Sequence, residues 1–392
     1  MSPKRTVAQL AVAQAFGQTF AGMILATTAL VGTMLASDKS LATLPHALGW
    51  VSVAACAIPA SQLMRRLGRR AGFMIGALIG IVGALIAAYG IYIGSFWTFA
   101  AGTITLGGFN AINLLYRFAA AETAPPGWRA KAISYVLAGS LVAGIIGPMI
   151  ATHTKDAFAV PFAGTYLTLV ALPVLMILTL AFTPLAPPAA AATRRAGRSL
   201  AEIARQPKFI VAVLAGMFGW AVMSLMMTAT PLAMIDCGFH FSDAAFVVQW
   251  HILGMYAPSF FTGWLIGRFG LSRIMLLGAL AQFGCVAAAL AGIEVWNFWL
   301  ANVLVGVGWN FLFVTGTALL TETHTADERA KVQGFNDFVI FGVVATTAFT
   351  SGWVQNNFGW ETVNWSVIPL ILAVIAAALW IGSKRPAPAP AE

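Results

Sequence analysis

The chain has 392 residues, of which 59% are hydrophobic and only 9% are charged, with a net charge of +9. Soluble domains carry about 25% charged residues, so this composition excludes a water-soluble globular protein. The high apolar fraction also excludes intrinsic disorder. A polytopic membrane protein remains, and the positions of its basic residues decide what the positive charge means.

Apolar segments long enough to cross a hydrocarbon layer of about 30 Å recur along the whole chain. They predict an all-α membrane protein with twelve transmembrane helices, in two sets of six. The predicted helices cover residues 7–35, 45–64, 71–93, 96–121, 131–152, 160–184, 208–235, 242–267, 273–293, 296–320, 331–355 and 360–382. The first segment has no convincing cleavage site and is read as an uncleaved helix.

The two sets of helices predict a two-domain organisation. Residues 1–185 form the first six-helix bundle, and residues 208–392 form the second with a short polar tail. Residues 186–207 are rich in proline, alanine and arginine and contain no apolar span, which indicates a cytoplasmic linker. The three cysteines are scattered and predict no disulfide framework.

The basic residues gather on one face of the predicted topology. With the N-terminus inside, 20 of the 22 lysines and arginines fall in cytoplasmic segments or at their helix ends, and only Lys39 and Lys155 fall outside. This asymmetry is the positive-inside rule, and it predicts that both termini are cytoplasmic. The positive charge therefore reflects topology, and no nucleic-acid partner is expected.

The two halves repeat each other. A shift of 200 residues superposes Gly108-Phe109-Asn110 on Gly308-Trp309-Asn310, Glu122-Thr123 on Glu322-Thr323, and Arg129-Ala130-Lys131 on Arg329-Ala330-Lys331. A shift of 202 superposes Arg66-Leu67-Gly68 on Arg268-Phe269-Gly270. Six helices per unit place both units in the same orientation, around an axis along the membrane normal, with a central cavity between them.

These loops also carry a family resemblance. The stretch SQLMRRLGRRAG at 61–72 and its partner GWLIGRFG at 263–270 resemble the loop motif of the major facilitator superfamily. In the first copy Ser61 replaces a common glycine and Arg65 replaces a common aspartate, which puts in doubt the inter-half salt bridge made by that aspartate. The resemblance covers the whole chain and implies a rocker-switch transporter rather than an enzyme.

Few charged residues lie within the predicted helices, and such residues are functional candidates. Asp337 is a candidate for proton coupling, although we favour a structural partner for the basic cluster. Arg117 is a candidate snorkelling or gating residue. Asn110, Asn113 and Asn310 are expected to form hydrogen bonds between helices.

Four soft ligands lie on the predicted seventh and eighth helices. Met223 and Met227 stand four residues apart, as do His251 and Met255, so each pair shares a helix face. Thioethers and an imidazole without a carboxylate suit Cu(I) better than zinc, manganese, magnesium or calcium. Methionine packing is the alternative interpretation, because methionine is a flexible filler of apolar cores.

The paired MxxxM and HxxxM motifs resemble those of a CcoA-like branch of the superfamily, the bacterial copper importers that supply cbb3-type cytochrome c oxidase assembly. The resemblance assigns Met223, Met227, His251 and Met255 to the copper path. It implies import of copper, as Cu(I), across the bacterial inner membrane by alternating access. Copper is then substrate and no cofactor is expected, with a downstream copper chaperone or oxidase assembly factor as a candidate partner beside the lipid bilayer.

A second group of soft ligands lies at the predicted outer mouth. Met234, Cys237 and His240 are spaced three residues apart, with Asp236 and Asp243 nearby. This spacing is a candidate capture point for copper. Ordinary loop chemistry is the interpretation that we favour slightly.

Two alternatives to copper import stay open. One keeps the fold and changes the cargo to riboflavin or another aromatic or amphipathic molecule, because relatives in that branch carry riboflavin. Aromatic residues of the predicted lining support it, namely Trp220, Trp250, Trp309 and Phe313. The other is a membrane assembly factor that hands copper to an oxidase subunit without transport.

Overall fold

The structure is a computed structural model, and it describes residues 3–38, 41, 44–185 and 197–383. The described residues form helices and no strands. The first half comprises α1 (Pro3–Leu35), α2 (Leu44–Tyr92), α3 (Phe96–Asn113), α4 (Tyr116–Thr123), the short 3₁₀ turn Pro126–Trp128, α5 (Arg129–Ala138), α6 (Ser140–Thr154), α7 (Ala163–Thr168) and α8 (Ala171–Ala181).

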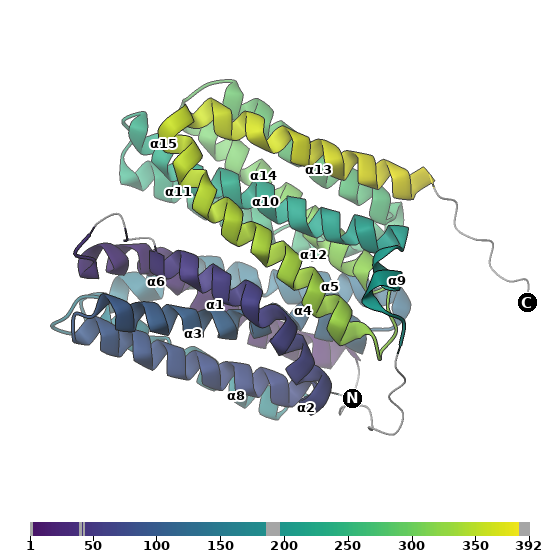
Figure 1. The fold of residues 1–392 in the computed structure, drawn as a ribbon, viewed down its shortest axis with the longest axis horizontal. Coiled ribbons are helices and arrows are strands. Elements are labelled where there is room, and N and C mark those ends of the chain that lie inside the picture. The colour runs from purple at the N-terminus through teal and green to yellow at the C-terminus, as the bar shows by residue number, and fades with distance from the viewer. Residues whose placement is uncertain (1–2, 39–40, 42–43, 186–196, 384–392) are drawn as a thin grey trace, which may run out of the picture.

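The second half follows a short connecting helix, α9 (Leu200–Ala204). It comprises α10 (Pro207–Asp236), α11 (Phe241–Tyr256), α12 (Ser259–Phe269), α13 (Leu271–Leu290), α14 (Val295–Leu320) and α15 (Arg329–Ser383). The start of α1, the helix α9 and the end of α15 lie at one end of the molecule (Figure 1), which we call the linker end. The opposite end is called the outer end.

These helices trace the twelve predicted membrane crossings, so the all-α fold class is confirmed. The long helices α2 and α15 each make two crossings, because each is interrupted by a glycine with a non-helical backbone. Four crossings consist of two consecutive shorter helices, namely α3–α4, α5–α6, α7–α8 and α11–α12. Eight of the described helical segments are long and apolar enough by themselves to span a membrane.

The internal repeat is visible in the backbone. Gly68 has φ 85° and ψ 164°, and Gly270, its counterpart at a shift of 202, has φ 86° and ψ 159°. Side chains disfavour this conformation, so glycine is required where the chain reverses between two crossings. The turn between the second and third crossings therefore has the same backbone geometry as the turn between the eighth and ninth.

Small residues allow close helix contacts within each bundle. Gly90 and Gly102 lie at the contact of α2 with α3. A Cβ atom added to Gly90 would lie 2.5 Å from the Phe99 nitrogen, and one added to Gly102 would lie 2.6 Å from the Ala87 nitrogen. Because lipid offers no hydrophobic gain for helix association, such close packing is a main source of stability.

The break between α11 and α12 has a local chemical cause. Pro258 has no backbone N–H, so the helix ladder is interrupted there. The Asn310 amide of α14 compensates, since its Nδ2 donates to the Met255 carbonyl and to the Ser259 hydroxyl, both at 2.6 Å. Asn310 thus bonds between helices, as the sequence predicted.

The described part of the linker is attached to the second half. The Arg198 side chain donates from Nη2 to Glu328 Oε2 at 2.7 Å and from Nε to Oε1 at 2.9 Å. The Arg198 backbone N–H also donates to Glu328 Oε1 at 2.7 Å. Ser199 and Glu202 then close a capping box that begins α9. Residues 186–196 of the predicted linker lie outside the described residues.

We expect Gly102→Ala to destabilise the first bundle, because the new methyl group would overlap the Ala87 backbone. Overpacking of this kind costs about 1–3 kcal/mol. The thermal unfolding midpoint of the purified protein measures the effect. Gly127→Ala is the matched control, since its Cβ would meet no atom within 4 Å. Equal midpoints for the two variants would contradict the close contact.

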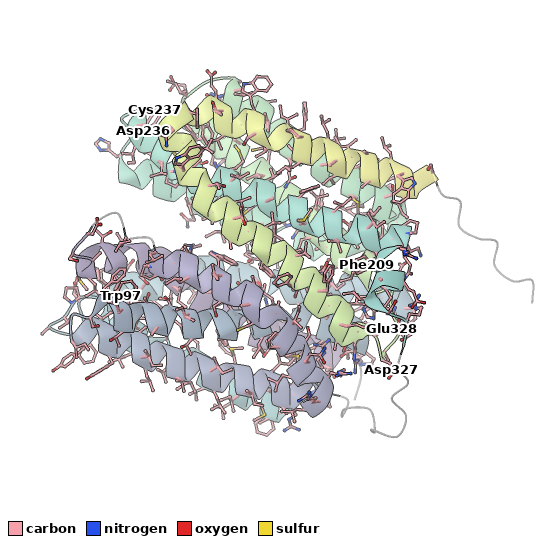
Figure 2. The ribbon with its side chains drawn as sticks, viewed as in Figure 1. Trp97, Phe209, Asp236, Cys237, Asp327 and Glu328 are labelled. Carbon is pink, nitrogen blue, oxygen red and sulfur yellow. The ribbon has the colours of Figure 1, made fainter. Side chains whose placement is uncertain are left out.

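We expect Glu328→Gln to release the linker, so that trypsin cleaves after Arg198 several-fold faster. Asp327→Asn, next to it in sequence and at the same end (Figure 2), should cleave like the unaltered protein.

The same contact predicts a pH dependence. Hydrogen bonds from Arg198 lower the pKa of Glu328 below its ordinary value. The contact is therefore fully present above an unfolded glutamate pKa of about 4.3 and is lost only as the pH falls through the lowered pKa. Hydrogen exchange of the α9 amides, corrected for intrinsic rates, should stay constant down to that unfolded pKa. A midpoint at the ordinary glutamate pKa would contradict the assignment.

Candidate functional site

A group of aromatic side chains occupies the junction of the two halves. It consists of Trp50 of α2, Trp220 of α10, Trp309 and Phe313 of α14, and Phe341 of α15, and we call it the central aromatic cluster. Trp50 stacks on Phe341 with ring centroids 6.0 Å apart, so a ring of the first half meets one of the second. The Trp220 ring lies against each of the other four, with centroid distances of 5.1 to 6.0 Å.

The cluster is asymmetric between the repeats. A shift of 200 residues relates the Trp220–Trp309 pair, with centroids 5.1 Å apart, to a Phe20–Phe109 pair at 4.6 Å in the first half. The same shift relates Phe313 to Asn113. The second half therefore contributes the larger rings, while the first contributes an amide at the corresponding position.

Several polar atoms of the aromatic cluster and of the first half are buried without a partner. Among the described residues, Nε1 of Trp220, Nε1 of Trp309, both amide atoms of Asn113 and Oε1 of Gln14 make no hydrogen bond. Burying such a group without a partner costs roughly 1–3 kcal/mol. The two tryptophan Nε1 atoms belong to the cluster and are available to a polar ligand or water at the junction. The Asn113 amide lies against Gly17 of α1 and makes none of the hydrogen bonds between helices that the sequence predicted for it.

A buried ion pair lies beside the cluster. The Arg117 guanidinium of α4 donates from Nη2 to Asp337 Oδ1 of α15, and the two side chains are only 1% and 3% exposed. Arg117 also donates to the Leu114 carbonyl at 2.7 Å, which is freed at the break between α3 and α4. Its guanidinium lies 4.6 Å from the centre of the Phe313 ring. The pair therefore connects the two halves and contacts the aromatic cluster.

A second ionic group connects the halves nearer the linker end. Arg69 of α2 binds Glu122 of α4 through Nη2 at 2.5 Å and Gln333 of α15 at 2.6 Å. Arg329 binds the same Glu122 at 3.0 Å. The Glu122 carboxylate thus lies between the two guanidinium groups, at the centre of this group.

Helices of the two halves also approach each other closely at the linker end. An added Cβ at Gly334 of α15 would lie 3.2 Å from the Ser61 Cβ of α2, and one at Gly263 of α12 would lie 2.6 Å from the Lys131 Cα of α5. These contacts and the two ionic groups hold the halves together at this end.

The predicted soft ligands lie within the second half. His251 is fully buried, Met223 and Met255 are 5% and 7% exposed, and Met227 is partly buried. The helices α10 and α11 contact each other, and each packs more extensively on α14. Met223, Met227 and Met255 all belong to or pack against the main apolar core.

The His251 ring is oriented by α14. Its Nδ1 lies 2.9 Å from the Asn302 carbonyl oxygen, which can only accept, so Nδ1 carries a proton. Nε2 has no partner among the described residues. In the neutral tautomer Nε2 presents a lone pair. A group of three or more histidine, cysteine or acidic side chains that could hold a metal is absent from the described part of the chain.

The outer group of soft ligands is spread over different environments. Met234 is fully buried in a small apolar cluster with Ala233, Ala244, Val247 and Phe298. Cys237 and His240 are exposed. Cys237 lies at the end of the second half opposite to Glu328 (Figure 2). The Asp243 carboxylate accepts from the His240 backbone N–H at 3.1 Å and thus caps α11. A capture role for Met234, Cys237 and His240 stays a prediction.

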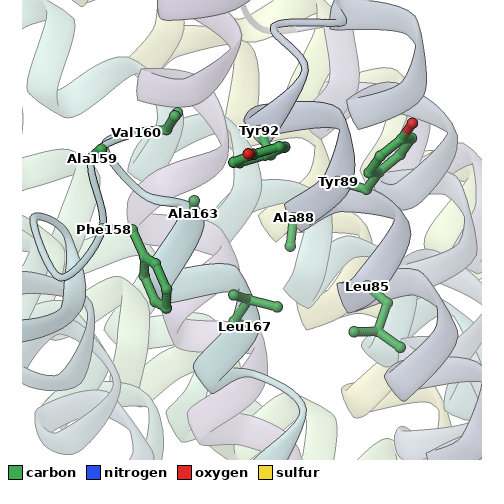
Figure 3. A pocket seen from close by; sticks show the side chains of 9 residues that line it. All are labelled: Leu85, Ala88, Tyr89, Tyr92, Phe158, Ala159, Val160, Ala163 and Leu167. Atoms are coloured by element: carbon green, nitrogen blue, oxygen red, sulfur yellow. The ribbon is translucent and has the colours of Figure 1, made fainter.

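A separate apolar pocket of about 430 Å³ lies on the side of the first half (Figure 3). It is formed by the C-terminal end of α2, by α7 and by the segment that leads into α7. Its lining residues are Leu85, Ala88, Tyr89, Tyr92, Phe158, Ala159, Val160, Ala163 and Leu167. Because both walls belong to one half, this pocket is distinct from the junction.

The structure adds residues that the sequence did not single out. Trp50 and Phe341 complete the aromatic cluster, and Arg69, Glu122 and Gln333 form the ionic group. The sequence held one indication of the ionic group, because Glu122 is repeated in the second half as Glu322. Trp250, predicted to line the cavity, is 38% exposed and pairs with Trp299 and Phe246 away from the cluster.

Comparison with known proteins agrees with this architecture. The chain is 42% identical over 378 residues to the riboflavin transporter RfnT of Brucella anthropi, covering 95% of this chain and 94% of that relative. It is 30% identical over 387 residues to the uncharacterized MFS-type transporter YddS of Bacillus subtilis, covering 93% and 89% of the two chains. The relative with the higher identity is thus named for riboflavin and not for copper.

A solved structure and a family model give the same fold. The proton:xylose symporter XylE superposes with a TM-score of 0.80 at 13% identity, covering 97% of this chain and 95% of that one. The model of the Major Facilitator Superfamily matches residues 10–288 and 236–392. This chain is therefore a multi-pass membrane transporter, not an enzyme, and it belongs to the major facilitator superfamily.

Proposed function

We propose that the protein is a secondary transporter of riboflavin or a closely similar flat aromatic molecule. The central aromatic cluster carries the proposal, because it lies where the two halves meet. The 42% identity to a riboflavin transporter over nearly the whole chain supports the same cargo. This proposal replaces copper as the leading hypothesis.

The chemistry of the junction suits a flavin ring. Riboflavin is an uncharged tricyclic ring with a hydroxylated side chain. Aromatic faces bind such rings by offset stacking or edge contacts, at centroid distances like those within the cluster. The unpartnered Trp220 and Trp309 Nε1 atoms can donate hydrogen bonds to the polar edge and hydroxyl groups of the cargo.

Alternating access supplies the transport step. The described contacts that hold the halves together near the linker end include those of Arg69, Arg117, Arg329, Gly263 and Gly334. Passage of cargo to that side requires these contacts to separate while the halves approach each other at the outer end. We infer that the protein lies in the bacterial inner membrane with the linker end cytoplasmic, in agreement with the distribution of basic residues.

Copper is the second candidate cargo, and one observation favours it. The Nδ1–H of His251 is held by a backbone carbonyl, and this arrangement orients many metal-binding histidines with Nε2 toward the metal. Met255 lies on α11 with His251, and Met223 and Met227 lie on the neighbouring α10. The protein would then import Cu(I), or bind and hand it to an oxidase assembly factor or copper chaperone without transport.

We expect Trp220→Leu to raise the KM for riboflavin about tenfold, since one stacking partner contributes about 1–3 kcal/mol. Trp220→Phe should raise it less, because a ring is kept. Uptake of labelled riboflavin by a bacterial strain that neither makes nor imports the vitamin measures both. Trp353→Leu, which removes a ring that is 59% exposed, is the control. A KM unchanged by Trp220→Leu would refute the stacking site.

We expect His251→Gln to leave riboflavin uptake intact, because glutamine can keep the hydrogen bond to the Asn302 carbonyl. Cells that express the unaltered protein should accumulate no more copper isotope than cells that carry an empty vector. Copper accumulation that disappears in His251→Gln or Met227→Leu would favour the second candidate. Binding of copper without accumulation in reconstituted vesicles would favour the assembly factor.

A further inference from the structure

In the Arg117–Asp337 pair, Arg117 has more contacts within its own half than Asp337 has within its half. If the halves separate, Arg117 keeps the Leu114 carbonyl and the face of Phe118, 4.4 Å away, because both belong to its own half. Within the described part of its half, Asp337 keeps a single side-chain hydrogen bond, from Asn336 Nδ2 to Oδ1 at 2.8 Å. Its Oδ2 has no partner in the described part of the chain.

The described elements around Asp337 supply no second acid. Arg69 of α2 adds positive charge to the electrostatic environment of this carboxylate. The contact from α14 is apolar, through Phe313 above Arg117. Where α10 approaches this part of α15, Gly216 lies against Ile340, and the ionisable residues of α10, Lys208 and Asp236, lie near its two ends. Among the described residues, Arg117 and Arg69 are therefore the charges that face Asp337.

We propose that Asp337 carries the proton that drives transport, so that one proton enters with each cargo molecule. An ionised Asp337 favours the closed linker end, because separation would leave a buried carboxylate without its counter-charge. A proton that binds Oδ2 from the outer side removes this penalty. The linker end then opens, the proton leaves to that side, and Asp337 binds Arg117 again when the halves close.

Phe313 connects the cargo site to the Arg117–Asp337 pair, and this step rests on the proposed function. Phe313 stacks on Trp309 with centroids 5.0 Å apart and covers the Arg117 guanidinium. A ring that enters the cluster must displace or repack Phe313. Cargo binding therefore weakens the contacts of Arg117 at the moment when protonation neutralises its partner.

Reconstituted vesicles test the coupling. A gradient of one pH unit, acidic outside, should drive about tenfold accumulation of riboflavin by the unaltered protein at one proton per cargo. Asp337→Asn should abolish this accumulation but keep exchange of labelled for unlabelled riboflavin. Asp337→Glu, which keeps a titratable group, should retain gradient-driven uptake with a shifted pH profile. Gradient-driven accumulation by Asp337→Asn would overturn the proposal, whereas absence of riboflavin exchange in the unaltered protein would overturn only the cargo.

A cross-link tests the proton step without any cargo. In a variant whose native cysteines are replaced, Ser61→Cys with Gly334→Cys should form a disulfide only while the linker end is closed. The yield should fall as the pH is lowered, and adding Asp337→Asn should make it low at every pH. Lys208→Gln, which removes an exposed pair with Glu322 inside the second half, should keep the pH dependence. An identical pH dependence with Asp337→Asn would refute the role of Asp337.

Discussion

The halves of this transporter are held together near the linker end by buried charge, and most of the functional argument depends on this interaction. Inside a membrane a charged group must find its partner within the protein. Arg117 finds that partner on the other half, in a carboxylate that is 3% exposed. Closer to the end, Arg329 of the second half pairs with Glu122 of the first, and Arg69 donates to Gln333 across the halves. Opening the linker end therefore requires that buried charges be separated or neutralised.

The duplication explains why the junction can recognise an asymmetric cargo. Equivalent positions hold phenylalanines in the first half and tryptophans in the second, and an amide at 113 corresponds to a ring at 313. The second half therefore supplies most of the rings of the central aromatic cluster. A cluster of rings suits a flat aromatic cargo better than a metal ion, which is the reason for preferring a flavin.

The sequence predicted the twelve crossings and the repeat because hydropathy and loop glycines act locally. Gly68 and Gly270 turn alike, as the shared loop motif indicated. The candidate site was predicted only in part. Periodicity placed Met227 and His251 on helix faces, but it could not tell that the His251 ring turns toward Asn302 of α14. Trp50 and Phe341 meet across the halves, 291 positions apart, and no local pattern relates them. Asp337 was noticed as a buried charge, while its partner depended on tertiary packing.

Equilibrium binding of riboflavin to the purified protein, followed by quenching of flavin fluorescence, tests the central claim most directly. Stacking on tryptophan should quench the flavin in a saturable way, and an excess of Cu(I) under reducing conditions should not displace it. Unquenched flavin together with stoichiometric copper binding that is lost in His251→Gln would contradict the account.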